Sequence, residues 1–119
     1  MHQIIKIRPL VDFWGTWCPP CRQAMPHLVE LQQQYNKDLF TILAIAVPPD
    51  NPKIVARYAA RHNLDAFPLP LADETVQQRY QVASYPSSFF IDRRGNVRYA
   101  YRGFWQDKFA EHIEELLAE

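Results

Sequence analysis

VDFWGTWCPPC, at residues 11–21, joins a predicted buried strand to a predicted helix that opens with two cysteines. The first half is a run of large apolar side chains around Asp12 that ends at Gly15, which is typical of a short strand inside a protein. Two prolines then separate Cys18 from Cys21, and prolines suit the first turn of a helix, where backbone amides have no intrahelical partner. The two thiols therefore lie on one side of a single turn, close enough to form a disulfide without rearranging the fold.

Outside this segment, the pattern of apolar residues predicts alternating strands and helices, which indicates an α/β fold. The run over 39–47 has no polar residue after Thr41 and predicts a central strand covered on both faces. Asn51 and Asp73 are predicted helix caps, and Gly95 is expected to supply the positive φ of a tight hairpin turn. The predicted order is a strand over 10–14, a helix over 19–35, a strand over 39–47, a helix over 52–63, an extended piece over 69–72, a helix over 74–80, strands over 87–91 and 97–101, and a helix over 105–117.

Composition and charge narrow the class of protein. Of the 119 residues, 48% are hydrophobic and 22% are charged, which is the profile of one soluble domain, predicted to span residues 1–119. The 13 basic residues balance the 13 acidic ones, so the net charge gives no reason to expect binding to nucleic acid or to an anionic membrane. Residues 1–14 contain neither an apolar run long enough to span a membrane nor a signal-peptide pattern, and they predict a strand instead.

The cysteine pair is the candidate for chemistry. A thiolate at a helix N-terminus is stabilised by unpaired backbone amides and by the helix dipole. Cys18, which is nearest that end and follows Trp17, is expected to attack a disulfide, and Cys21, one turn further and more buried, is expected to resolve the mixed disulfide. Zinc binding would need two further ligands, and the four histidines are scattered along the chain. Two inert cysteines in the core are the other alternative.

The same residues carry a resemblance to a known family. VDFWGTWCPPC resembles the active-site segment of the thioredoxin superfamily. From about residue 7 to its end, the chain resembles the TlpA/ResA group, which includes the DsbE-type proteins of cytochrome c maturation, through RQAMP after the second cysteine, QVASYPSSFFID and the DRRGNV hairpin. The resemblance implies a thioredoxin fold, with a central mixed sheet flanked by helices and a helix and a strand inserted over about 49–72.

The resemblance also implies roles for residues around the pair. The acid at the position of Asp12 lies beneath the cysteines in thioredoxin-like proteins, which implies a raised pKa and a role as general base for Cys21. The residues alone leave another interpretation open, in which Asp12 reaches solvent at the end of a strand. Pro86 is expected to be cis and to leave the backbone of Tyr85 free to pair with an extended substrate segment, and Trp17 is expected to line the same surface.

The chain departs from the group in three respects. Ala24 stands where relatives usually carry an acid, and Ser87 stands where they usually carry threonine. Members also commonly have an N-terminal anchor or signal and a β-hairpin before the active-site strand, and the 119 residues are expected to lack both, since the active-site strand lies close to their start. The intact protein is nevertheless expected to be anchored and to work outside the cytoplasm, as its relatives imply.

The function that the resemblance implies is the reduction of disulfides in cysteine-containing proteins, with apocytochrome c as a candidate substrate. No metal or organic cofactor is expected, because the Cys18/Cys21 pair itself carries the electrons, and a membrane thiol transporter of the DsbD or CcdA kind would restore them. The chain is expected to be a monomer. The alternatives are a disulfide oxidase, since Pro-Pro between the cysteines does not settle the redox potential, and a copper-binding or redox-sensing module. A peroxidase is disfavoured, because the chain lacks a P-x-x-x-T-x-x-C segment.

Overall fold

The predicted alternation of strands and helices is present in the computed structural model, which describes residues 7–119. The elements are β1 (Arg8–Trp14), α1 (Pro19–Gln33), β2 (Phe40–Ala46), α2 (Pro52–Arg61), α3 (Glu74–Arg79), β3 (Ser87–Ile91), β4 (Val97–Arg102) and α4 (Gln106–Ala118). The predicted caps are confirmed, because Asn51 and Asp73 each accept a hydrogen bond from the backbone N–H three residues on, at 3.0 and 3.1 Å. Gly95 has a φ of 84° in the β3–β4 hairpin, as predicted. Residues 1–6, part of the stretch predicted to lack a signal or spanning segment, lie outside the described residues.

Four strands form a mixed sheet in the order β2-β1-β3-β4, with β1 parallel to β2 and antiparallel to β3. The predicted mixed sheet flanked by helices is confirmed. The central position predicted for residues 39–47 is wrong, because β2 lies at one edge of the sheet and β1 lies inside it. The run is apolar because both faces of β2 are packed: Ile42 and Ala44 belong to one cluster of buried side chains, and Leu43 and Ile45 pack against another.

The segment over 68–72 runs along the outer edge of β2. The carbonyl oxygens of Pro68 and Pro70 accept hydrogen bonds from backbone N–H groups of β2 at 3.1 and 2.8 Å. The short strand predicted here is reduced to one isolated parallel bridge between Ala46 and Leu71. The reason is that Pro68 and Pro70 have no N–H groups to return to β2, so a regular ladder cannot form.

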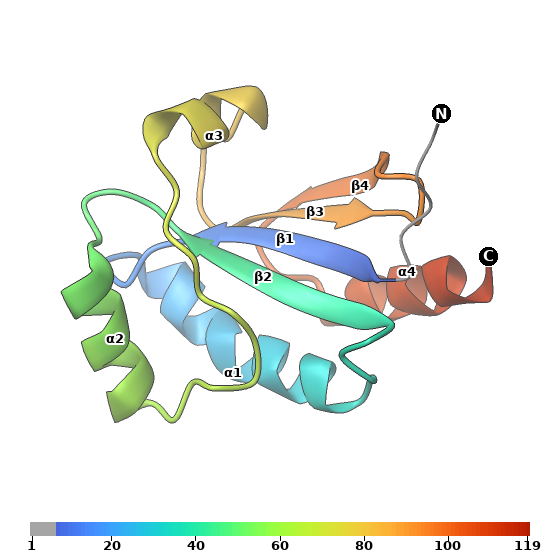
Figure 1. The fold of residues 1–119 in the computed structure, drawn as a ribbon, viewed down its shortest axis with the longest axis horizontal. Helices are drawn as coiled ribbons and strands as arrows, with labels where there is room; N and C mark the ends of the chain where they lie inside the picture. Colours follow the sequence, from blue (N-terminus) through green and yellow to red (C-terminus); the bar gives the residue numbers. More distant parts are fainter. Residues whose placement is uncertain (1–6) are drawn as a thin grey trace.

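Helices cover both faces of the sheet, with α1 and α4 below it and α3 above it in Figure 1. On the first face, Leu28 of α1, Val55 of α2 and Phe109 of α4 pack with Leu10 and Phe90 of the sheet. On the other face, Val76 of α3 packs against a smaller cluster that includes two side chains of β1, Val11 and Phe13. Among the described residues, no helix has the length and apolar content needed to cross a membrane.

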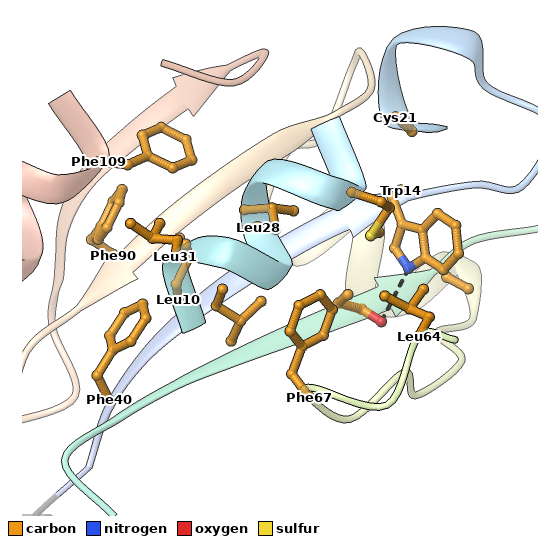
Figure 2. Close-up of a cluster of buried hydrophobic side chains, with 14 of the residues drawn as sticks. Leu10, Trp14, Cys21, Leu28, Leu31, Phe40, Leu64, Phe67, Phe90 and Phe109 are labelled. Atoms are coloured by element: carbon orange, nitrogen blue, oxygen red, sulfur yellow. Dashed lines mark hydrogen bonds between the residues drawn. The ribbon is translucent and has the colours of Figure 1, made fainter. Parts of the chain in front are cut away.

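The larger core extends to the cysteines. Figure 2 shows Trp14 at the end of this core that is nearest Cys21, with its indole N–H donating to the carbonyl oxygen of Ala44 at 3.1 Å. Trp14 is fully buried and ties the end of β1 to β2. The strand end from which the cysteine loop departs is therefore held in a rigid part of the molecule.

Candidate active site

The two cysteines form a disulfide at the start of α1. Cys18 is the N-cap residue, Cys21 lies in the first turn, and their Cα atoms are 5.2 Å apart. Both are buried, but 5% of Cys18 is exposed against 1% of Cys21. The predicted order of exposure of the two residues is confirmed, which favours Cys18 as the one that an incoming group meets first.

The position of Cys18 favours a thiolate once the disulfide is reduced. The backbone N–H of Cys21 donates to Cys18 Sγ at 3.3 Å, so this sulfur takes the place of a helix-capping oxygen. Backbone amides and the dipole at a helix N-terminus stabilise a negative charge there. Both cysteines belong to the same buried cluster, but Cys21 is the more buried of the two and does not cap the helix, and burial disfavours a charged sulfur. This arrangement favours the predicted roles, with Cys18 as the nucleophile and Cys21 as the thiol that needs a base.

The loop before the disulfide presents Trp17 to solvent. Its side chain is 42% exposed, and its indole lies edge-on against the ring of Tyr85, with the ring centroids 5.6 Å apart. Gly15 permits this arrangement, because a Cβ at that position would overlap the indole of Trp17. The structure therefore brings together three residues that the sequence predicts for one surface, namely Trp17, Cys18 and Tyr85.

The peptide bond between Tyr85 and Pro86 is cis, as the resemblance implies. The carbonyl oxygen of Tyr85 lies 3.7 Å from Cys18 Sγ. The tyrosine hydroxyl donates to Gln77 Oε1 at 2.6 Å, and the Pro86 carbonyl accepts from the N–H of Gly103 at 2.7 Å, so side chain and backbone are both held. A peptide strand pairing with the backbone at Tyr85 would bring its own sulfur next to Cys18.

Asp12 is buried in the middle of β1, with 2% of it exposed. The alternative interpretation, in which Asp12 reaches solvent at the end of a strand, is therefore wrong. Side chains alternate along a strand, which places Asp12 on the same face as Leu10 and Trp14, the face that α1 covers. Its Oδ1 accepts from the hydroxyl of Ser88 at 2.7 Å, and its Oδ2 has no hydrogen-bond partner among the described residues. Burial raises the pKa of Asp12 from 3.8 to about 7, although the Ser88 hydrogen bond opposes the rise. Such a carboxyl can take or give a proton near neutral pH.

Ser88 lies beside Asp12 in the site, although the sequence analysis does not single it out. It lies opposite Asp12 in the β1–β3 pairing and is 1% exposed. A serine inside an apolar strand indicates a hidden hydrogen-bond partner, but this partner is 76 residues away and only the strand register identifies it. Within the described residues Asp12 hydrogen-bonds Ser88 and neither cysteine, so its service to Cys21 stays a prediction.

Replacing Ser88 by alanine is expected to raise the pKa of Asp12 further, because the carboxylate loses the only hydrogen bond described for it. A loss of about 1.4 kcal/mol of bonding to the charged form would cut the ionised fraction at pH 7 from about one half to about one tenth. Carbon-detected NMR titration of the Asp12 carboxyl measures this directly. Ser87→Ala is the matched control, because the Ser87 hydroxyl donates to the Ser84 carbonyl instead, at 2.6 Å. An unchanged or lower pKa in Ser88→Ala would contradict the assignment.

Comparisons with known proteins agree with this geometry. A sequence model of the AhpC/TSA family matches residues 8–100. The chain is 35% identical over 109 residues to the thiol-disulfide oxidoreductase ResA of Geobacillus kaustophilus, across 89% of this chain and 61% of that protein. It is 31% identical over 121 residues to the thiol:disulfide interchange protein DsbE of Pseudomonas aeruginosa, across 97% of this chain and 65% of that protein.

The fold also has solved counterparts. The crystal structure of a thiol:disulfide interchange protein of the thioredoxin family from Chlorobium tepidum matches with a TM-score of 0.82 and 27% sequence identity, over 94% of this chain and 81% of that one. The predicted thioredoxin fold is thereby confirmed. The chain spans less than two thirds of the length of the two sequence relatives. It belongs to the AhpC/TSA family and is a TlpA/ResA/DsbE-like member of the thioredoxin superfamily.

Proposed function

We propose that this chain is a thiol-disulfide oxidoreductase that reduces disulfides in proteins. The observation that carries the proposal is the Cys18–Cys21 disulfide at the N-terminus of α1, with Cys18 Sγ 3.7 Å from the carbonyl oxygen of Tyr85. The names of the ResA and DsbE relatives, which describe thiol-disulfide exchange, support the activity, and the direction is the proposal's own. The disulfide is thus interpreted as the oxidised form of a pair that carries two electrons when reduced, rather than as a structural crosslink.

In the proposed cycle, the reduced protein gives two electrons to its substrate. The Cys18 thiolate attacks one sulfur of a substrate disulfide, and the other substrate sulfur leaves as a thiolate and takes a proton. Asp12 then accepts the proton of Cys21, and the Cys21 thiolate attacks Cys18 Sγ. The mixed disulfide breaks, the second substrate sulfur leaves and is protonated, and the Cys18–Cys21 disulfide forms. With a pKa of about 7, Asp12 is ionised in about half of the molecules at neutral pH and can accept that proton.

The proposed substrate is an extended, cysteine-containing protein segment. The Tyr85 carbonyl beside Cys18, the Tyr85 side chain held by Gln77 and the exposed Trp17 beside it support this class over a small thiol. Apocytochrome c is a candidate from the family resemblance alone. The same resemblance underlies three further proposals: a membrane thiol transporter of the DsbD or CcdA kind as electron donor, no added cofactor, and a place outside the cytoplasm.

The test is the reduction potential of the Cys18/Cys21 pair. The protein is equilibrated in thiol-disulfide buffers and its free thiols are counted. A value near about −270 mV, together with reduction of a peptide disulfide by the reduced protein, is expected for a reductase. A value near about −120 mV would identify an oxidase and overturn the proposed direction. A pair that does not cycle at all, or that binds Cu(I) and exchanges no disulfide, would overturn the activity itself.

A further inference from the structure

Thr16, two residues before the attacking cysteine, is held at three of its polar groups. Its backbone N–H donates to Asp50 Oδ2 at 2.8 Å, and its hydroxyl donates to Asp50 Oδ1 at 2.6 Å. Its carbonyl oxygen accepts from Arg22 Nη1 at 2.9 Å. Thr16 is only partly buried, so these hydrogen bonds, rather than surrounding side chains, set its position. A carboxylate that accepts two hydrogen bonds from one residue also fixes the orientation of that residue.

Asp50 belongs to the connection between β2 and α2, far from the cysteines in sequence. Its own N–H donates to the Val47 carbonyl at 3.1 Å, and the next residue, Asn51, caps α2. The N–H of Val47 donates to the carbonyl of Trp14 at 3.0 Å. Asp50 is therefore fixed to the rigid end of the sheet and holds the start of the cysteine loop against it.

The residues that Thr16 leads into are those that meet a substrate. Trp17 follows directly, and the N–H of Cys18 closes the loop on the Gly15 carbonyl at 3.1 Å. The distance of 3.7 Å between Cys18 Sγ and the Tyr85 carbonyl oxygen, and the contact of Trp17 with the Tyr85 ring, both depend on where this loop lies. A loop free to shift would move the nucleophile relative to the backbone on which a substrate segment aligns.

We propose that Asp50 is a positioning residue for disulfide exchange with polypeptides, acting through Thr16 on Trp17 and Cys18. This inference rests on the proposed function. Two kinds of substrate should respond differently to a shift of this loop. A polypeptide disulfide must be aligned with Cys18 by contacts at Tyr85, so its reaction depends on the position of the loop. A small aromatic disulfide reacts in many orientations, so its reaction depends only on the reactivity of the thiolate.

The experiment compares both substrates in Asp50→Ala and Asp50→Asn. Reduced proteins react with a synthetic extended peptide that carries a disulfide and with dithiobis-nitrobenzoate. Asp50→Ala is expected to slow the peptide reaction about tenfold and the small-disulfide reaction less than about twofold. Asp50→Asn is expected to restore most of the peptide rate, because its oxygen can accept from the Thr16 N–H while its amide donates to the Thr16 hydroxyl.

Asn51→Ala is the matched control, because it removes the neighbouring cap of α2 and leaves Thr16 untouched. It is expected to change the ratio of the two rates less than Asp50→Ala does. Amide hydrogen exchange is measured on the same proteins, and Asp50→Ala is expected to speed exchange at Thr16 and Cys18 while leaving β1 unchanged. Equal slowing of both substrates, no rescue by asparagine, or unchanged exchange would overturn the inference. A wild-type protein without peptide reduction would refute the proposed function instead, and the exchange measurement would still test the role of Asp50.

Discussion

Cys18→Ser is expected to abolish the reduction of a peptide disulfide, with a loss of about a thousandfold or more, because the hydroxyl that replaces the thiolate is a far weaker nucleophile at neutral pH. Cys21→Ser is expected to behave differently. It keeps the attacking sulfur at the helix N-terminus and removes the group that resolves the intermediate, so the reaction should stop after one step. The product is a stable mixed disulfide between Cys18 and the peptide.

Mass spectrometry of the non-reduced proteins measures this difference. The Cys21→Ser protein should gain the mass of one peptide half, and dithiothreitol should remove it, whereas the Cys18→Ser protein should gain far less in the same time. The control is the wild-type protein, which should end as the internal disulfide with no added mass. If both serine variants captured the peptide equally fast, the division into attacking and resolving sulfurs would be wrong, despite their different exposure of 5% and 1%.

Asp12→Asn is expected to change the pH dependence of stability far more than the replacement of an exposed carboxylate does. In the wild type, burial holds the pKa of Asp12 at about 7 against 3.8 in the unfolded chain. Between these two values the folded protein binds more protons than the unfolded one, so the free energy of unfolding falls as pH rises. The fall contributed by Asp12 amounts to about 4 kcal/mol between pH 4 and pH 8, and asparagine removes it.

Urea unfolding of the oxidised protein at several pH values from 4 to 8 checks this expectation. Asp12→Asn should flatten the slope and should be more stable than the wild type at pH 8, by up to about 4 kcal/mol. Asp65→Asn, at an exposed position, is the control and should leave the slope in place. A parallel slope in Asp12→Asn and wild type would show that Asp12 is not buried as a weak acid. In the reduced protein, the same substitution should also slow the resolution of the mixed disulfide near pH 8.

The sequence predicts those parts of the site that depend on neighbouring residues. The disulfide, the first turn of α1 and the caps of α2 and α3 are local features, and each is in place. The cis bond before Pro86 is different, because the residues alone favour trans and only the family resemblance predicts cis. The position of Cys18 at the start of α1 can therefore be predicted from neighbouring residues, whereas the conformation at Tyr85 and Pro86 can be predicted only from the family resemblance.

What the sequence could not predict are contacts between distant segments. Ser88 meets Asp12, and Asp50 meets Thr16, across 76 and 34 residues. Each partner is an ordinary polar residue whose significance depends on strand register or on the path of a loop. The outer position of β2 could not be predicted for a related reason, since an apolar strand covered on both faces has the same sequence pattern at the edge of a sheet as at its centre.

The coverage of β2 by the segment over 68–72 has a consequence for aggregation. An open sheet edge is a template on which another chain can add a strand, and under the proposed function this protein would meet extended polypeptides repeatedly. Along β2, Pro68 and Pro70 occupy part of that template while offering no N–H of their own. On the opposite outer strand, β4, the exposed Arg102 places a charge beside the edge where a second chain would have to pair. Both outer strands of the sheet therefore carry features that disfavour the addition of a further strand.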